Sequence, residues 1–253
     1  MTLVAALPMY DWPERRAEVD AQWVAIRDRL RAKGFDAPEL LTRRNGDLPA
    51  VPGGIRDASG AVIAPDPATL PPDELDLPTL WRHPALLFTQ TCWGPMELGL
   101  APHVHVAGQD DYSGMAGGDD ALYSSALVMR RGEGLAVPAP DGSEPALPAS
   151  ARMRGKRLAF NSLDSMSGYL GIQRDLAARG EGFELFARLV ETGGHRMSIE
   201  AVASGRADIA AIDCKSWALA QRYDEAASAL IVVGWTGKRK GLPFISAFED
   251  VVI

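Results

Sequence analysis

The 253-residue sequence contains only two cysteines, Cys92 and Cys214, and it lacks a long apolar run. Two cysteines are too few for a disulfide framework or a cysteine metal cluster. They could pair, but they lie far apart in the sequence, and we expect both to be free and buried. No segment approaches the roughly 20 apolar residues that a membrane span requires, so we expect no membrane insertion. Residues 2–9 have the pattern of a core strand, which leaves no room for a leader. We therefore expect a periplasmic protein if a leader has been removed, and a cytoplasmic one otherwise.

Positive charge is also scarce. Lys and Arg number 26 against 33 Asp and Glu, so the net charge is -7, and the basic residues are dispersed, which argues against a nucleic-acid partner. The sequence has no Gly-x-Ser-x-Gly elbow, no phosphate loop and no dinucleotide fingerprint. His103 and His105 would share one face of a strand, but no further histidine lies nearby. We expect neither a metal site nor a cofactor.

What the sequence does contain is an alternation of strand and helix patterns. The apolar run at 3–7 predicts a buried strand, and Pro13 opens a helix. An apolar stripe along that helix consists of Val19, Trp23, Ile26 and Leu30. Further strands are predicted at 86–91, 104–107, 123–130, 157–161, 208–213 and 230–233, with helices at 165–179, 197–204 and 215–221. Between them, residues 44–78 form a surface excursion with a hairpin near 57–60. This order predicts an α/β protein with ligand sites at the carboxyl ends of strands.

Polar residues follow several of these strands, most clearly in the segment 155–170. A strand ends there and a helix begins near Ser165, with hydroxyl, amide and glycine groups in the turn: Asn161, Ser162, Ser165, Ser167 and Gly168. The first N–H groups of a helix have no internal partners and carry the positive end of the helix dipole. Such a turn can hold an anion, although simple capping by Asp164 or Ser165 explains the same pattern.

Four other strand ends are also polar. Residues 9–12, 89–95 and 191–196 each follow a strand or lead into a helix, and Asp213 ends a strand just before a helix. Each of these segments alone is explained by a cap or by a surface side chain. Five of them in one chain indicate a ligand site.

Landmarks spread along the chain carry a resemblance to a known family. They are Leu86-Leu-Phe-Thr-Gln-Thr-Cys92, Tyr123-Ser-Ser-Ala-Leu-Val-Met-Arg130, Gly155-Lys-Arg-Leu-Ala-Phe-Asn161, Asp164-Ser-Met-Ser-Gly168, Thr192-Gly-Gly-His195, the segment 201–213 and Gly241-Leu-Pro-Phe244. In this order they resemble the substrate-binding proteins of phosphate, phosphite and phosphonate ABC transporters, which have the type 2 periplasmic-binding fold. The Ser-x-Ser-Gly turn resembles the phosphonate-binding element of that family.

The resemblance implies two α/β lobes, each with a mixed sheet flanked by helices, joined by two hinge crossings with the ligand in the cleft between them. Lobe one would comprise 1–108 plus 225–253, and lobe two 120–213. Residues 109–119 and 214–224 would form the hinge regions. The hinges would absorb the closure motion, and the ligand would select the closed state.

The same resemblance implies a set of ligand-binding residues: Tyr10, Gln90, Thr91, Trp93, Ser124, Ser125, Asn161, Ser162, Ser165, Met166, Ser167, Gly168, Gly194, His195 and Asp213. Among these, Ser165, Ser167 and Gly168 would hold the anionic group. Asp213 would favour a ligand that carries a proton or an amine, such as a zwitterionic aminophosphonate.

We therefore expect a monomeric solute-binding protein that closes on a small phosphonate or phosphate-like ligand, delivers it to an ABC permease and catalyses no reaction. Two alternatives stay open, because a fold does not determine a function. One is a cytosolic ligand sensor. The other is an enzyme on the same fold, for which Asn161, Ser162, His195 and Asp213 would be the first candidates for chemistry.

Overall fold

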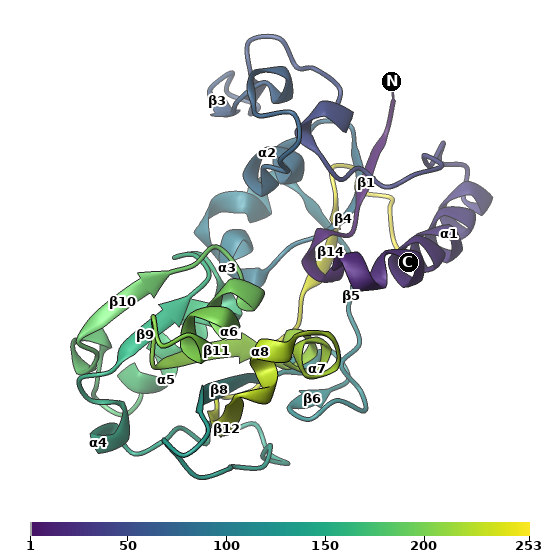
Figure 1. Ribbon diagram of the computed structural model, residues 1–253. Coiled ribbons are helices and arrows are strands. Elements are labelled where there is room, and N and C mark those ends of the chain that lie inside the picture. Colours follow the sequence, from purple (N-terminus) through teal and green to yellow (C-terminus); the bar gives the residue numbers. More distant parts are fainter. Residues whose placement is uncertain (1) are drawn as a thin grey trace. The chain divides into compact units, whose positions relative to one another are not determined.

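The computed structural model describes residues 2–253, so Met1, with which the predicted first lobe begins, lies outside the described part. The chain divides into two compact units (Figure 1). The first unit comprises Met1–Asp110 and Leu242–Ile253, and the second comprises Asp111–Gly241. The chain passes from one unit to the other after residue 110 and returns after residue 241.

The first unit is built on a four-stranded mixed sheet. In spatial order its strands are β1 (Val4–Ala6), β4 (Leu86–Gln90), β14 (Pro243–Ser246) and β5 (His105–Gln109). β1 and β4 are parallel, and β14 is antiparallel to both of its neighbours. β14 was not predicted, since it is short and begins with a proline, which strands accept at their first residue.

Side-chain alternation along β1 gives this sheet a core on each face. Ala5 and Leu7 pack against helix α1 (Arg16–Ala32), whose predicted apolar stripe is buried as expected. Val4 and Ala6 belong to the second cluster, which also contains Leu80 and Trp81 of helix α2 (Leu77–Arg82). Alternate residues of a strand point to opposite faces, which is why a continuous apolar run marked this strand.

The remaining elements of the first unit are short. The predicted hairpin is confirmed as β2 (Ile55–Arg56) paired with β3 (Val62–Ala64). Single turns of helix are Pro8–Tyr10, Pro13–Arg15, Asn45–Asp47, Pro67–Thr69, α3 (Trp93–Pro95), Met96–Leu100 and Ala101–His103. His103 therefore ends a helical turn, and the prediction that it shares a strand face with His105 is wrong.

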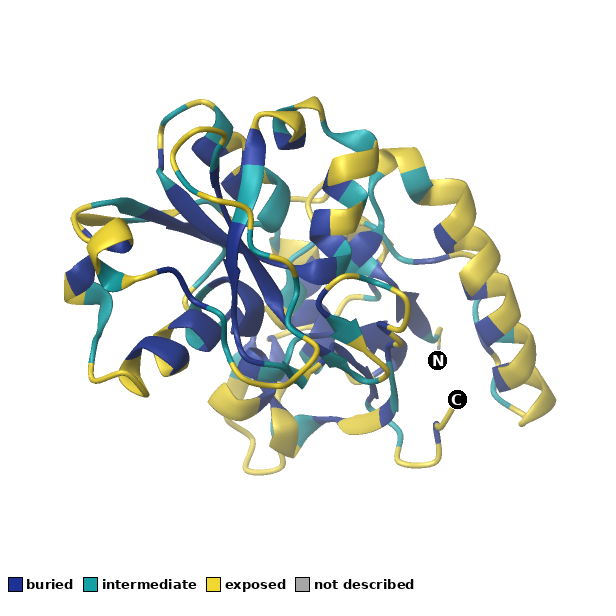
Figure 2. Ribbon diagram, turned by 90° about the horizontal axis from the view of Figure 1, so that it is seen from below, coloured by how far each residue is buried: buried dark blue, intermediate teal, exposed yellow. Residues whose placement is uncertain are grey.

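The second unit contains a five-stranded sheet whose three central strands are almost wholly buried (Figure 2). In spatial order they are β10 (Arg188–Glu191), β9 (Arg157–Phe160), β11 (Ile209–Asp213), β8 (Ser125–Arg130) and β12 (Leu230–Trp235). β10, β9 and β11 are parallel, and β8 is antiparallel to both β11 and β12. We call the edge where β10, β9 and β11 end the carboxyl edge, and the other the opposite edge.

Helices cover both faces of this sheet. The chain runs from β9 through α5 (Gly171–Ala177) to β10, and then through α6 (His195–Ala203) back past β9 to β11. Because such connections are right-handed and these two run in opposite directions, α5 and α6 lie on opposite faces. Ile172 and Leu176 of α5 pack on Leu127, Leu158 and Ala211 of the sheet. The other elements are α4 (Ser150–Met153), a turn at Met166–Leu170, Phe183–Leu185, α7 (Cys214–Tyr223), α8 (Glu225–Ser228), and the small sheet of β13 (Arg239–Lys240), β7 (Leu122–Tyr123) and β6 (Gly118–Asp119).

Two of the predicted boundaries differ from the structure. β12 pairs along β8, so residues 225–241 belong to the second unit and not to the first. The predicted hinge at 214–224 is helix α7 inside the second unit, and the chain leaves that unit only after residue 241. The error has a simple cause: an apolar run shows that a strand is buried, but not which sheet it joins.

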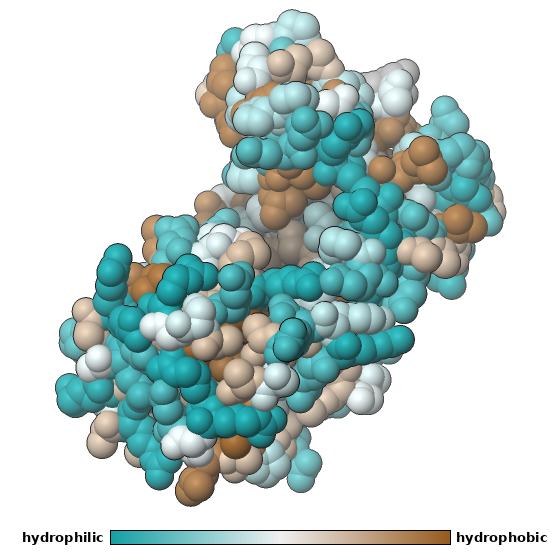
Figure 3. All heavy atoms as spheres, in the orientation of Figure 1, coloured by the Kyte–Doolittle hydropathy of each residue, from teal (hydrophilic) through white to brown (hydrophobic). Residues whose placement is uncertain are grey.

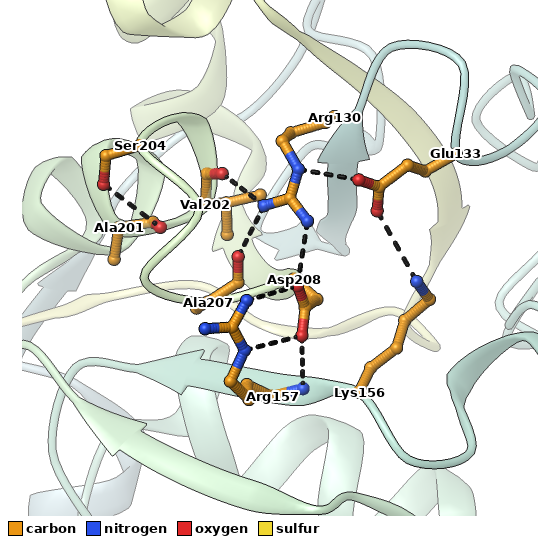
Figure 4. Close-up of polar contacts among 9 residues, drawn as sticks. All are labelled: Arg130, Glu133, Lys156, Arg157, Ala201, Val202, Ser204, Ala207 and Asp208. Carbon is orange, nitrogen blue, oxygen red and sulfur yellow. Dashed lines mark hydrogen bonds and ion pairs between the residues drawn. The ribbon is translucent and has the colours of Figure 1, made fainter.

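A network of ion pairs lies at the opposite edge of the five-stranded sheet (Figure 4). Asp208 accepts hydrogen bonds from Arg130 Nη2 at 2.8 Å and from the backbone N–H, Nε and Nη2 of Arg157 at 2.7–2.9 Å. Arg130 also donates to the carbonyl oxygens of Val202 and Ala207. The hydrogen bonds from Arg157, followed by those from Arg130, hold the pKa of Asp208 well below its usual value.

Several predictions from composition can be compared with the described residues. Across residues 2–253, no helix is long and apolar enough to span a membrane, and no three metal-ligating side chains form a group. Among the described residues neither cysteine forms a disulfide; Cys214 is buried and Cys92 only half-buried, so the expected burial of Cys92 is wrong. On the face drawn in Figure 3, hydrophobic side chains lie in scattered spots among hydrophilic ones.

Candidate functional site

The carboxyl edge of the five-stranded sheet gathers most of the predicted ligand-binding residues of the second unit. Asn161 directly follows β9, His195 comes shortly after β10, and Asp213 ends β11. Ser125 begins β8 and lies opposite Asp213 in the antiparallel register. The ends of neighbouring parallel strands meet at one edge, so polar residues far apart in the sequence become neighbours there.

The turn after β9 is partly explained by helix capping. Ser165 is the N-cap, and its Oγ accepts a hydrogen bond from the backbone N–H of Gly168 at 3.0 Å. A Cβ on Gly168 would lie 2.8 Å from Asn161 Oδ1, so the glycine lets the Asn161 amide lie beside the start of the helix. Ser162 donates its hydroxyl proton to Asp164. Met166 and Ser167 are buried in the first turn.

Ser167, His195 and Asp213 are in direct contact. Ser167 Oγ lies 2.8 Å from His195 Nε2, and Asp213 Oδ2 lies 3.1 Å from the same nitrogen. Gly194 precedes His195 in extended conformation as the N-cap of α6. Burial lowers the pKa of His195 below its usual value, and the Asp213 carboxylate opposes part of that shift. His195 is therefore neutral at pH 7.

Asp213 is the most constrained member of this group. Its side chain is 4% exposed, and its Oδ1 accepts a hydrogen bond from the backbone N–H of Ser216 at 2.9 Å, which caps α7. In an acyl-transfer triad the serine and the carboxylate contact different ring nitrogens of the histidine. Here Ser167 and Asp213 contact the same nitrogen, so the arrangement differs from that of a nucleophile activated by a base.

Several buried side-chain atoms at the predicted residues have no hydrogen-bond partner within the described part of the chain. They include Ser124 Oγ, Asn161 Oδ1 and His195 Nδ1 in the second unit and Thr91 Oγ1 in the first. Unpaired polar atoms are costly to bury and are rare in folded proteins. All four of these atoms belong to residues that the sequence predicts to bind a ligand.

The four predicted residues of the first unit lie at the ends of its two parallel strands. Tyr10 ends the helical turn that follows β1, and it is buried. Gln90 ends β4, and its side-chain nitrogen lies 3.4 Å from Asp110 Oδ2. Thr91 and Trp93 follow directly, Trp93 as the first residue of α3. The assignment of these four residues to a ligand site stays a prediction.

The structure adds polar residues that the sequence did not single out. Thr236 follows β12 and accepts a hydrogen bond from the backbone N–H of Ser125 at 2.8 Å. The signal was present, since Thr236 is a polar residue after a strand, but that strand was assigned to the wrong lobe. Arg239 contacts the carbonyl oxygen of Gly171 at 3.2 Å and pairs with Asp175. It brings a cation to the helix after the serine turn, already paired with a carboxylate.

Comparison with known proteins identifies a family and a fold. The family model described as "ABC transporter, phosphonate, periplasmic substrate-binding protein" matches residues 102–245, which is more than half of the chain. No curated protein sequence matches the chain.

Two solved structures share the fold. One is PhnD1 of Prochlorococcus marinus in complex with methylphosphonate, with a TM-score of 0.52 and 18% identity over 66% of this chain. The other is a binding protein component of an ABC phosphonate transporter from Pseudomonas aeruginosa, with a TM-score of 0.57 and 14% identity over 98% of this chain. The chain covers 58% of the first protein and 70% of the second. At these identities the likeness establishes the periplasmic-binding fold, as predicted.

Proposed function

The chain belongs to the family of periplasmic substrate-binding proteins of phosphonate ABC transporters, and from that membership we propose that it binds a small phosphonate or phosphate-like ligand and delivers it to a membrane permease. The family is periplasmic, and we place the function of this chain in the same compartment. The observation that carries the proposal for the site is the contact group of Ser165, Ser167, His195 and Asp213 at the carboxyl edge.

We place the anionic group of the ligand at the start of the helix after β9. The hydroxyl groups of Ser165 and Ser167 are neutral donors, and the helix contributes the positive end of its dipole. Hydrogen bonds from neutral donors to an ionised acceptor are stronger than those between neutral groups. Asp213 already places a carboxylate at this edge, and recognition of the anionic group by neutral hydroxyl groups adds no further charge there. An aminophosphonate whose amine pairs with Asp213 stays a prediction.

The direct test is isothermal titration calorimetry with methylphosphonate, phosphate and sulfate. We expect one-to-one binding of methylphosphonate or phosphate. Ser167→Ala should weaken that binding at least tenfold, because a hydrogen bond to a charged group contributes about 1.5–3 kcal/mol. The matched control is Ser204→Ala, which removes an exposed hydroxyl bonded to the Ala201 carbonyl in the same unit and should leave the affinity unchanged.

The proposal fails if no phosphonate or phosphate binds while an unrelated solute raises the melting temperature. Native mass spectrometry of freshly purified protein provides a second check, since a co-purified ligand would appear as a defined added mass. Binding without turnover predicts that the phosphorus NMR spectrum of methylphosphonate shows no new species after prolonged incubation. A new phosphorus signal would favour the enzyme alternative.

A further inference from the structure

His195 has two ring nitrogens and, in its neutral state, a single N–H proton. Nε2 lies within hydrogen-bond distance of Ser167 Oγ at 2.8 Å and of Asp213 Oδ2 at 3.1 Å. Nδ1 is buried and has no hydrogen-bond partner within residues 2–253. The position of the proton therefore decides which groups around the ring can donate.

With the proton on Nδ1, the ring would bury an N–H group without an acceptor, and Asp213 Oδ2 would face the lone pair of Nε2. With the proton on Nε2, the carboxylate receives a charge-assisted hydrogen bond, and the unpartnered Nδ1 carries only a lone pair. Unpaired buried N–H groups are rarer in proteins than unpaired acceptors. The backbone N–H of Asp213 would favour the opposite tautomer, but it lies 3.5 Å from Nε2 and is the weaker contact.

We propose that Asp213 holds the proton of His195 on Nε2 and thereby leaves the hydroxyl proton of Ser167 for the ligand. Since Nε2 is a donor in this tautomer, Ser167 Oγ accepts from it and cannot donate to it. The Ser165 hydroxyl is in a similar position, because its oxygen accepts from the backbone N–H of Gly168. The oxygens of Ser165 and Ser167 lie 3.5 Å apart, a long contact in which either hydroxyl can donate to the other. The Ser167 proton is not used by His195 in this tautomer and can be offered to an anionic group, so Asp213 acts as a positioning residue.

This inference gives Asp213 a different task from the receipt of a ligand amine. If Asp213 only bound an amine, the loss of its charge would not weaken the binding of methylphosphonate, which has no amine and is itself an anion. If Asp213 sets the tautomer, the loss of its charge weakens methylphosphonate binding as well. The role of the Ser167 proton rests on the proposed function, whereas the tautomer is a property of the protein without ligand.

The first experiment is nitrogen NMR of the histidine rings in the ligand-free protein. The chain has four histidines, and His195→Gln identifies the signals of His195. We expect a protonated Nε2 and an unprotonated Nδ1 in the wild type. In Asp213→Asn, the amide oxygen can still cap α7 while the amide nitrogen donates to Nε2, so the proton should move to Nδ1. A wild-type His195 protonated on Nδ1 would overturn the proposal without any variant.

The second experiment is a calorimetric double-mutant cycle with methylphosphonate. We expect Asp213→Asn and Ser167→Ala each to weaken binding at least tenfold, and the double variant to lose no more affinity than Ser167→Ala alone. The matched control is Asp76→Asn, an N-cap carboxylate that accepts from the Thr79 N–H at 2.9 Å in the other unit. It should bind like the wild type. If Asp213→Asn binds methylphosphonate as tightly as the wild type, or if the losses of affinity add up in the double variant, the proposed role of Asp213 is wrong.

The two experiments separate the two proposals. If no phosphonate or phosphate binds the wild type, the proposed function fails, while the NMR result still decides whether Asp213 sets the tautomer of His195. If methylphosphonate binds but His195 carries its proton on Nδ1, the proposed function stands and the role of Asp213 is wrong.

Discussion

The two edges of the five-stranded sheet in the second unit use polar side chains in contrasting ways. At the opposite edge, Asp208 accepts four hydrogen bonds from two arginines. At the carboxyl edge, the group around Asp213 consists of hydroxyls and a neutral histidine. Buried atoms that have no partner among residues 2–253, including Asn161 Oδ1 and His195 Nδ1, lie at the carboxyl edge.

The contrast separates a structural role from a binding role. A polar group that stabilises the fold has its partners inside the protein, because an unpaired buried group costs free energy. A group that binds a ligand keeps part of its hydrogen-bonding capacity for the ligand, so the free protein accepts that cost. Arg130 and Arg157 lie at the opposite edge, away from the edge at which we propose that the ligand binds.

The largest effect is expected at the opposite edge. Asp208→Ala leaves Arg130 and Arg157 without their shared carboxylate, and we expect the free energy of unfolding to fall by about 2–3 kcal/mol. Urea denaturation measures this change. Asp73→Ala, which removes an 86% exposed carboxylate, is the control and should change little. Ligand affinity should stay at the wild-type value. A tenfold loss of affinity would show that the opposite edge also contributes to ligand binding.

A smaller effect, on binding, is expected from Gly168→Ala. The added methyl group would lie 2.8 Å from Asn161 Oδ1 and 3.1 Å from Ser165 Oγ, so both side chains must move. Displacement of these side chains would disturb the proposed anion site, and we expect methylphosphonate binding to weaken by roughly tenfold. Gly142→Ala is the matched control, because its methyl group would meet no atom within 4 Å. Equal affinities of the two variants would show that the turn does not bind the ligand.

The two edges should also lose stability in different ranges of pH. His195 has a lowered pKa in the folded protein, so below about pH 6.5 the unfolded chain binds a proton that the folded chain does not, and stability falls as the pH falls. Asp208 also has a lowered pKa, and its contribution is lost only below about pH 4.

Thermal unfolding between pH 7.5 and 5 measures the first of these effects. His195→Gln should flatten the dependence on pH in that range, whereas His105→Gln, which changes an exposed histidine, should not. His83 has a pKa lowered by burial and contributes a slope of the same sign in all of these proteins, so the comparison of variants isolates His195. Identical slopes for wild type and His195→Gln would contradict the assignment.

The smallest effect is expected from Ser124→Ala. Its Oγ is buried and has no hydrogen-bond partner in the described part of the chain, so its removal should change the free energy of unfolding by no more than about 0.5 kcal/mol. Ser198→Ala is the contrasting variant: the Ser198 hydroxyl is equally buried but lies 2.6 Å from Thr192 Oγ1, and its loss should cost about 1 kcal/mol. A large destabilisation by Ser124→Ala would show that this hydroxyl belongs to the fold.

Much of the molecule followed from local pattern in the sequence. The stripe from Val19 to Leu30 predicted α1 because the helical period places these side chains on one face. The polar residues Asn161, His195 and Asp213 were identified because each follows or ends a strand. The capping of a helix by Ser165 was also readable, as a local hydrogen bond between residues three apart.

Other features depended on which strands are neighbours, and only the tertiary structure decided those. The pairing of β12 with β8 placed residues 225–241 in the second unit, and the antiparallel β14 completed the sheet of the first. The contact of Ser167 and Asp213 with one nitrogen of His195 joins three segments through the order of β9, β10 and β11. Local periodicity determines which residues are buried or lie at a strand end, whereas strand order, set by long-range packing, determines which of them meet.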